Sequence, residues 1–142
     1  MNDIHEEATL RLRRVGQRYT RQRRALVDLL RKAPRPLSAA EIYESTRDLP
    51  QSSIYRNIAV LEQASVVHKL VARGDFASFE LAEDLGEHHH HMICTSCGKV
   101  DDFTPTPQLE QAAAALNRIA GRASFKVHAH RLDVVGLCSD CR

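Results

Sequence analysis

The sequence predicts an α+β protein in which an N-terminal winged helix-turn-helix is followed by a small α/β domain. This class is predicted by helical periodicity over residues 20–63, by two β-prone runs around a glycine turn at 66–82, and by a second half that mixes short strands with one helix. At about 100–200 residues per domain, 142 residues suffice for one domain or two very small ones. We expect the first domain at residues 1–82, a linker at 83–87 and the second domain at 88–142.

Three helices are expected in the first domain. Apolar residues of the first helix share one face: Leu26, Leu29, Leu30 and Ala33. Thr20 is expected to cap this helix and Pro34 to end it. Ser38 and Glu41 form the Ser-x-x-Glu capping box that starts the next helix. The third helix is expected from about residue 52, with an inward face of Ile54, Ile58 and Leu61.

The wing is expected as a β-hairpin after the third helix. Residues 66–71 are β-prone, the turn Arg73-Gly74-Asp75 follows, and a second β-prone run extends from Phe76 to Ala82. A winged helix-turn-helix lays one helix in the major groove of DNA. The order of elements therefore indicates DNA as a partner.

The second half is expected to contain strands at residues 88–95, 99–103 and 125–137. Thr106 and Pro107 start a helix as N-cap and first helical residue, and Gly121 ends it. Its apolar stripe consists of Leu109, Ala112, Ala113, Leu116 and Ala120. With roughly 55 residues, this half is near the size at which a core is marginal without a metal or a partner chain.

Charge is unevenly distributed along the chain. Residues 1–35 carry ten Lys and Arg against four Asp and Glu, although the net charge of the whole chain is only +2. A basic front suits a polyanion, and a solvated helical surface is the alternative. No apolar run approaches the ~20 residues of a membrane-spanning helix, and no apolar signal segment is seen. We therefore expect a cytoplasmic protein without a membrane partner.

All four cysteines fall into two Cys-x-x-Cys pairs, Cys94/Cys97 and Cys138/Cys141. Two such pairs complete the tetrahedral sulfur shell that suits Zn²⁺. Disulfides are rare in the expected cytoplasmic location. A redox pair fits less well because neither motif opens a helix after a buried strand. We expect a structural zinc site that stabilises a domain with little core.

Four consecutive histidines, His88 to His91, precede the first cysteine pair. Because side chains alternate across a strand, His88 and His90 face one way, and His89 and His91 face the other. One strand can thus serve two metal sites, each of which needs further ligands. Candidate ligands, each of which can also be a solvated polar residue, are His68, Glu80, Asp102, Glu110, His128 and His130. Imidazole with carboxylate suits Zn, Fe, Mn, Ni or Co.

Several segments of the chain resemble the ferric uptake regulator family. They are Tyr19-Thr20-Arg21-Gln22-Arg23, Ile54-Tyr55-Arg56, the run from His88 to Lys99, Phe125 to His130, and Gly136 to Cys141. The resemblance covers about residues 10–142 and implies a homodimeric, metal-dependent transcriptional repressor with a C-terminal dimerisation domain. A palindromic operator is then the expected DNA partner. A zinc enzyme is not expected, because the chain lacks a His-Glu-x-x-His helix and a deaminase motif. A metal-storage protein would need no DNA-reading element.

The resemblance also implies roles for individual residues. The structural zinc site is assigned to the four cysteines. The regulatory site is assigned to His68, Glu80, His89 and His91. A second site in the dimerisation domain is assigned to His88, His90, Glu110 and His130. The expected DNA contacts are Tyr19, Arg21, Arg23, Tyr55 and Arg56.

The expected metal at the regulatory site depends on two positions. Pro36 stands where iron, nickel and peroxide sensors of the family usually have a histidine, and His68 falls where zinc sensors take a ligand from the wing. The resemblance therefore favours the zinc-uptake branch, with Zn²⁺ expected over Fe²⁺ or Mn²⁺. Zinc sensors also use a cysteine before the histidine run, and here Glu80 is expected in its place, with Glu83 or Asp84 as substitutes. Asp102 resembles a ligand of the peroxide-sensing branch, so an iron-responsive or peroxide-sensing repressor is the alternative.

Overall fold

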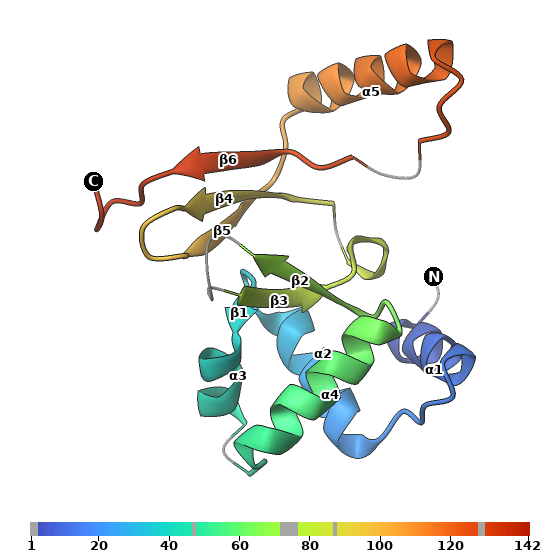
Figure 1. Cartoon of the computed structure of the whole chain (residues 1–142), viewed down its shortest axis with the longest axis vertical. Helices are drawn as coiled ribbons and strands as arrows, with labels where there is room; N and C mark the ends of the chain where they lie inside the picture. The colour runs from blue at the N-terminus through green and yellow to red at the C-terminus, as the bar shows by residue number, and fades with distance from the viewer. Residues whose placement is uncertain (1–2, 47, 72–76, 87, 128–129) are drawn as a thin grey trace.

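The computed structural model describes residues 3–46, 48–71, 77–86, 88–127 and 130–142. Its helices are α1 (Ile4–Arg14), α2 (Arg21–Lys32), α3 (Ala39–Ser45), α4 (Gln51–Gln63) and α5 (Pro107–Arg122), with a short 3₁₀ helix η1 (Glu83–Leu85). Its strands are β1 (Leu37–Ser38), β2 (Val67–Val71), β3 (Ala77–Leu81), β4 (His90–Cys94), β5 (Val100–Phe103) and β6 (Asp133–Gly136). They form two three-stranded sheets, β1-β3-β2 and β5-β4-β6. Figure 1 shows the second sheet between the first sheet and α5.

The predicted helices and wing strands of the first half are present. Thr20 caps α2 through its side chain, and Ser38 and Glu41 make both hydrogen bonds of the capping box at α3. The wing strands β2 and β3 pair antiparallel, with His68 opposite Glu80. The predicted turn at residues 73–75 lies outside the described residues. The core under the wing contains the predicted inward residues Leu26, Leu30, Ile54, Ile58 and Leu61.

Two elements of the first half were not predicted. Helix α1 begins after Asp3, whose carboxylate accepts a hydrogen bond from the His5 amide, and it buries Ala8 and Leu12 completely. The apolar residues Ile4, Ala8 and Leu12 recur every four positions, which is the signal that predicts this helix. Strand β1 has only two residues, too few for a periodic pattern, and pairs with β3.

The second sheet is built around β4. This strand pairs antiparallel with β5 and parallel with β6, so that Cys94 lies opposite Gly136. The final strand is shorter than the predicted 125–137, because only Asp133–Gly136 pair with the five-residue β4. The histidine run also enters the sheet later than predicted, with β4 starting at His90.

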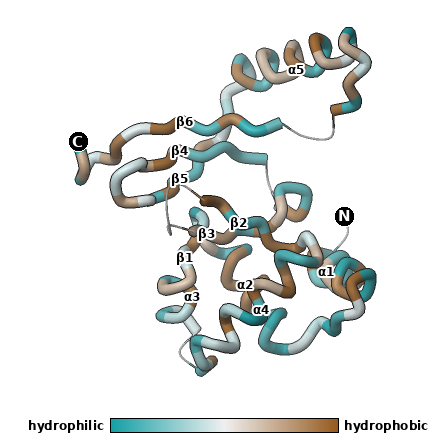
Figure 2. Tube along the Cα trace, in the orientation of Figure 1, coloured by the Kyte–Doolittle hydropathy of each residue, from teal (hydrophilic) through white to brown (hydrophobic). Residues whose placement is uncertain are grey.

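Helix α5 stands apart from the sheet (Figure 1), and none of its residues is buried. The predicted apolar stripe lies on this helix but is not covered by the described residues, since Leu116 is 58% exposed. Apolar residues on α5 and β6 appear in Figure 2 as brown segments, and several of them are exposed: Leu116, Ile119, Val134 and Val135. In the described part of the chain, no helix combines the length and apolar character needed to cross a membrane.

Candidate metal centres and nucleic-acid interface

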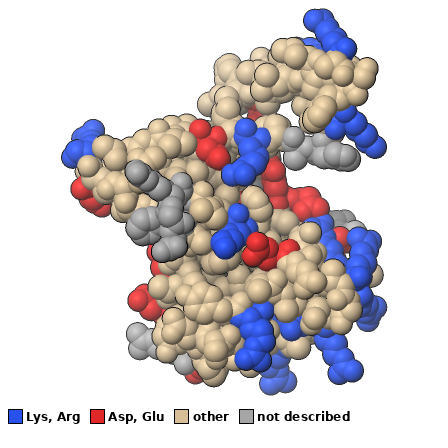
Figure 3. Space-filling view, viewed as in Figure 1, with Lys and Arg blue, Asp and Glu red and all other residues tan. Residues whose placement is uncertain are grey.

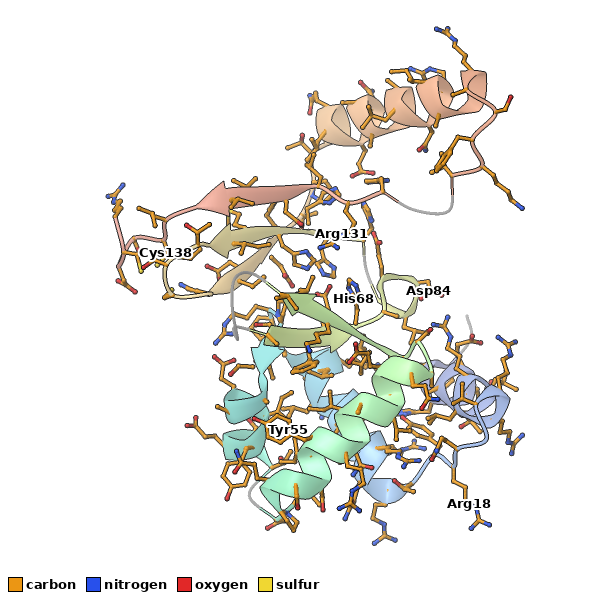
Figure 4. The ribbon with its side chains drawn as sticks, viewed as in Figure 1. Arg18, Tyr55, His68, Asp84, Arg131 and Cys138 are labelled. Atoms are coloured by element: carbon orange, nitrogen blue, oxygen red, sulfur yellow. The ribbon has the colours of Figure 1, made fainter. Side chains whose placement is uncertain are left out.

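The four cysteines meet at one end of the second sheet. Because β4 and β6 run parallel, Cys94 at the end of β4 and Cys138 just after β6 reach the same edge. One ligand atom from each of the four cysteines lies within 4.8 Å of the others, and all four are free thiols. Figure 4 shows Cys138 at this edge, away from the first half.

Hydrogen bonds shift the pKa values of the cysteine thiols in opposite directions. Backbone amides of Cys97 and Cys138 lower the pKa of Cys94 to about 6, which favours its thiolate. A hydrogen bond with Ser96 lowers the pKa of Cys141, but those with the neighbouring cysteines outweigh it and raise the pKa to about 12. Four thiolates repel one another unless a cation neutralises them. The group is therefore a zinc-type structural site.

A second group of ligands, here called the inter-sheet cluster, joins the two sheets. It consists of Glu80, His89, His91 and Asp102, whose ligand atoms lie within 4.8 Å of one another. Glu80 comes from β3 of the first sheet, while the other three belong to the second half. Glu80 Oε2 lies 2.8 Å from His89 Nε2 and 3.1 Å from His91 Nε2. Asp102 Oδ1 lies 3.6 Å from His91 Nε2.

The charges of the inter-sheet cluster suit a divalent cation. Burial raises the pKa of Glu80, but hydrogen bonds with His91 and His89 outweigh burial and hold the pKa below its ordinary value. Burial also raises the pKa of Asp102. Asp102 Oδ1 is buried without a hydrogen-bond partner among the described residues, and a cation would satisfy it. Behind the cluster, Asp133 Oδ1 lies 3.5 Å from His91 Nδ1, the position of a carboxylate that orients a histidine ligand.

His68 lies beside the inter-sheet cluster but is not a member of it. Its strand position is opposite Glu80, and it lines a small cavity of ≈ 50 Å³ together with Glu80, His89 and His91. Figure 4 shows His68 on the wing where it faces the second sheet. The structure thus brings three of the four predicted regulatory residues together and adds Asp102 as the fourth member.

The other face of the histidine run forms the second cluster: His88, His90, Glu110 and His130. Glu110, in the first turn of α5, places Oε1 3.1 Å from His88 Nε2 and 3.2 Å from His90 Nε2. The Nε2 atom of His130 is buried without a hydrogen-bond partner in the described structure, which fits a ligand role. All four predicted residues are therefore brought together, while His128 lies outside the described residues.

The predicted DNA contacts divide into two groups. Arg21, Tyr55 and Arg56 are exposed, with Tyr55 52% accessible on α4. Figure 3 shows Lys and Arg side chains gathered at the end of the first half that faces away from the second sheet, and acidic side chains between the halves. Figure 4 shows Arg18 and Tyr55 on the same half.

Arg23 and Tyr19 instead have partners within the fold. Arg23 Nε donates to Oδ1 of the buried Asn57 at 3.0 Å, and this contact joins α2 to α4. The Tyr19 hydroxyl lies 2.7 Å from His5 Nδ1, and burial raises the pKa of Tyr19 to about 12. Both residues position helices of the first half.

Comparison with known proteins agrees with this architecture. A model of the ferric uptake regulator family matches residues 14–135. The chain belongs to this family. The ferric uptake regulation protein of Legionella pneumophila is 33% identical over 96% of this chain and 99% of its own length. The peroxide-responsive repressor PerR of Staphylococcus aureus (strain USA300) is 34% identical over 96% of this chain and 90% of its own length.

Solved structures of the family share the fold. The Helicobacter pylori ferric uptake regulator, described as having three functional metal binding sites, aligns with a TM-score of 0.73 and 27% identity over 97% of this chain and 91% of that chain. A zinc-bound manganese uptake regulator aligns with a TM-score of 0.63 and 26% identity over 96% of this chain and 99% of that chain. The predicted α+β class is confirmed, with an N-terminal DNA-binding domain and a C-terminal dimerisation domain. The chain is a non-enzymatic, metal-dependent transcription regulator.

Proposed function

We propose that this regulator is a metal-activated repressor whose sensing site is the inter-sheet cluster. The main support for this proposal is that the ligands of the cluster come from both halves of the chain. Glu80 belongs to the wing sheet, whereas His89, His91 and Asp102 belong to the second half. An ion held by all four side chains supplies positive charge between the halves and restricts their relative orientation. We place the hinge at residues 83–87, between domains at 1–82 and 88–142.

The proposed metal is Fe²⁺ or Mn²⁺. Two imidazoles and two carboxylates form a nitrogen and oxygen donor set without sulfur, which suits these ions. The named relatives are a ferric uptake regulator and a peroxide-responsive repressor. Both the donor set and the relatives support the iron-responsive or peroxide-sensing function over the zinc-sensing function that Pro36 and His68 favour.

Zinc sensing remains the second candidate because of His68. This side chain lies opposite Glu80 on the wing and lines the cavity of the inter-sheet cluster. Three imidazoles and one carboxylate form a closed tetrahedral set for Zn²⁺. In this arrangement, His68 takes the place of Asp102 as the fourth ligand.

The proposed DNA interface is on α4 and the start of α2. Tyr55 would contact base edges or thymine methyl groups, while Arg56 and Arg21 would contact phosphates. A homodimer presents two such helices to a two-fold related operator, so the proposed site is a short palindrome. The exposed apolar residues on α5, on β6 and directly after β6 supply the surface for the second copy of the chain: Leu116, Ile119, Val134, Val135 and Leu137.

Operator binding at buffered free metal concentrations tests the sensing site. Duplexes selected from random sequence by the metal-loaded protein serve as operators, and gel shifts are measured with Fe²⁺, Mn²⁺ and Zn²⁺ for wild type, His89→Ala, Asp102→Ala and His68→Ala. We expect Fe²⁺ or Mn²⁺ to activate wild type, and both His89→Ala and Asp102→Ala to abolish activation. Activation by zinc alone, lost in His68→Ala and kept in Asp102→Ala, would establish the zinc candidate instead. A wild-type response in His89→Ala would show that the sensing site lies elsewhere.

A further inference from the structure

The short helix η1, which connects the two halves, carries two adjacent acidic residues with different partners. Glu83 contacts His88 Nδ1 in the second cluster, whereas Asp84 contacts Arg11 on α1. Figure 4 shows Asp84 on this connection, between α1 and the second half. The Ala82 amide donates to the Val66 carbonyl at 2.9 Å, and Leu85 packs against the core of the first half. The connection is therefore docked on the first half rather than free.

Arg11 holds Asp84 with a two-pronged contact. Its Nη1 donates to Asp84 Oδ1 at 3.2 Å, and its Nη2 contacts Asp84 Oδ2. The same guanidinium donates to the Ser65 carbonyl at 2.7 Å and to Glu7 Oε1 at 2.9 Å. The Arg11 side chain is only 14% exposed, whereas that of Asp84 is 66% exposed, and the two-pronged geometry gives the contact a defined direction. Arg11 thus joins α1, the turn that follows α4 and η1 at one point.

Glu83 occupies the position of a carboxylate that orients a metal-ligating histidine. His88 Nε2 lies 3.1 Å from Glu110 Oε1 inside the second cluster, while His88 Nδ1 contacts Glu83 on the other side of the ring. A carboxylate at Nδ1 places the ring proton there and leaves Nε2 free for a ligand role. When Nε2 binds a metal, Glu83 is placed to hold the proton on Nδ1 and to fix the direction of the His88 ring.

We propose that Glu83 and Asp84 couple the second cluster to α1 and α4, with Arg11 as the anchor in the first half. A metal in the second cluster holds the His88 ring in one orientation, and the contact with His88 then holds the Glu83 side chain. Because Asp84 is the next residue, its orientation toward Arg11 is restricted as well. The second cluster thereby influences the orientation of the DNA-binding helices, although all its ligands belong to the second half. This proposal rests on the proposed function only in that it takes the second cluster as a metal site.

Metal titrations in the His89→Ala background test the coupling, because this variant removes one ligand of the inter-sheet cluster and keeps every member of the second cluster. Zn²⁺ is titrated without DNA into the full chain, with its cysteine site already filled, by competition with a chromophoric chelator. We expect Glu83→Gln to weaken Zn²⁺ binding by about 10–100-fold, as for loss of a carboxylate behind a histidine ligand. We expect Asp84→Asn to weaken it by at least about fivefold, although Asp84 contacts no member of the cluster.

The double variant Glu83→Gln/Asp84→Asn separates coupling from a purely structural role. If Asp84 acts through Glu83, its substitution has no further effect once Glu83 is changed, whereas independent roles give losses that add. Glu62→Gln, which changes an exposed carboxylate on α4, is the matched control and is expected to bind Zn²⁺ like the background protein. Circular dichroism confirms that each variant is folded.

Two results with the Asp84 variants would overturn the coupling. One is an unchanged Zn²⁺ affinity in Asp84→Asn, and the other is additive losses in the double variant. Absence of any Zn²⁺ site beyond the cysteines in the His89→Ala background would also overturn it, without affecting operator control by the inter-sheet cluster. Conversely, failure of metal-dependent operator binding leaves these DNA-free titrations intact.

Discussion

At the scale of single residues, Arg23 and Arg56 have opposite environments although both are arginines of the helix-turn-helix. Arg23 donates to the buried Asn57, whereas Arg56 is exposed on α4. We expect Arg56→Ala to weaken operator binding and to reduce the log–log salt dependence by about one unit, with stability unchanged. We expect Arg23→Ala to lower the free energy of unfolding by about 1–3 kcal/mol, because the buried Asn57 Oδ1 loses the donor that Arg23 supplies. Fluorescence anisotropy and urea denaturation separate the two effects, and equal stability of both variants would contradict this division.

The metal-site histidines and Arg23 show how much of a site can be predicted from sequence. Alternation along the histidine run correctly separates His88 and His90 from His89 and His91, because this needs only the period of a strand. The choice between His68 and Asp102 depends on how the two sheets approach each other, which no local pattern encodes. Likewise, the partner of Arg23 comes from a helix more than thirty residues later, so its internal contact is invisible in its own segment.

At the scale of elements, the cysteine site connects the ends of β4 and β6. Cys94→Ser removes the ligand that is buried and hydrogen-bonded to the Cys138 amide at 3.4 Å. We expect this variant to lose the tightly held zinc and its dimeric state, since metal binding stabilises a half that has little core. Metal analysis and analytical ultracentrifugation check this. A zinc-free Cys94→Ser protein that stays dimeric would show that the cysteine site does not support the dimer.

Helix α5 provides the second prediction at this scale. Its exposed Ile119 is 61% accessible, and the helix buries no residue within the described chain. If a second copy covers this face, Ile119→Glu places a charge in an apolar interface, and we expect the dimer to weaken by at least about tenfold, or ~1.4 kcal/mol. Leu10→Glu on α1 is the control, because Leu10 is also exposed but lies in the first half. Equal dimer affinity in both variants would place the interface elsewhere.

The elements also differ in how far sequence predicts them. Helices α2 and α3 are predicted with their caps, because Thr20, Ser38 and Glu41 act within their own turns. Strand β6 is predicted too long, since its length is set by the neighbouring β4. The stripe of α5 is recognised correctly as apolar, but periodicity does not tell whether the covering surface belongs to the same chain or to another.

At the scale of the whole molecule, the inter-sheet cluster is proposed to link metal binding to DNA binding through the relative orientation of the two halves. Glu80 moves with the wing, and the other three ligands move with the second sheet. An orientation that brings the four ligands together is therefore favoured by the metal, and the same orientation is proposed to favour the operator. Binding linkage requires that each ligand raises the affinity for the other by the same factor, typically about 5–150-fold.

This reciprocity is a prediction that separates a switch from a merely structural metal. We expect wild-type protein to bind the activating metal about 5–150-fold more tightly in the presence of saturating operator than in its absence, by the factor that the metal gives to operator affinity. A scrambled duplex of the same length is the control for charge. Arg56→Ala should keep the metal affinity of the free protein, because it lies outside all three ligand groups. Equal metal affinity with operator and with the scrambled duplex would mean that the ion stabilises the fold without favouring the DNA-competent orientation.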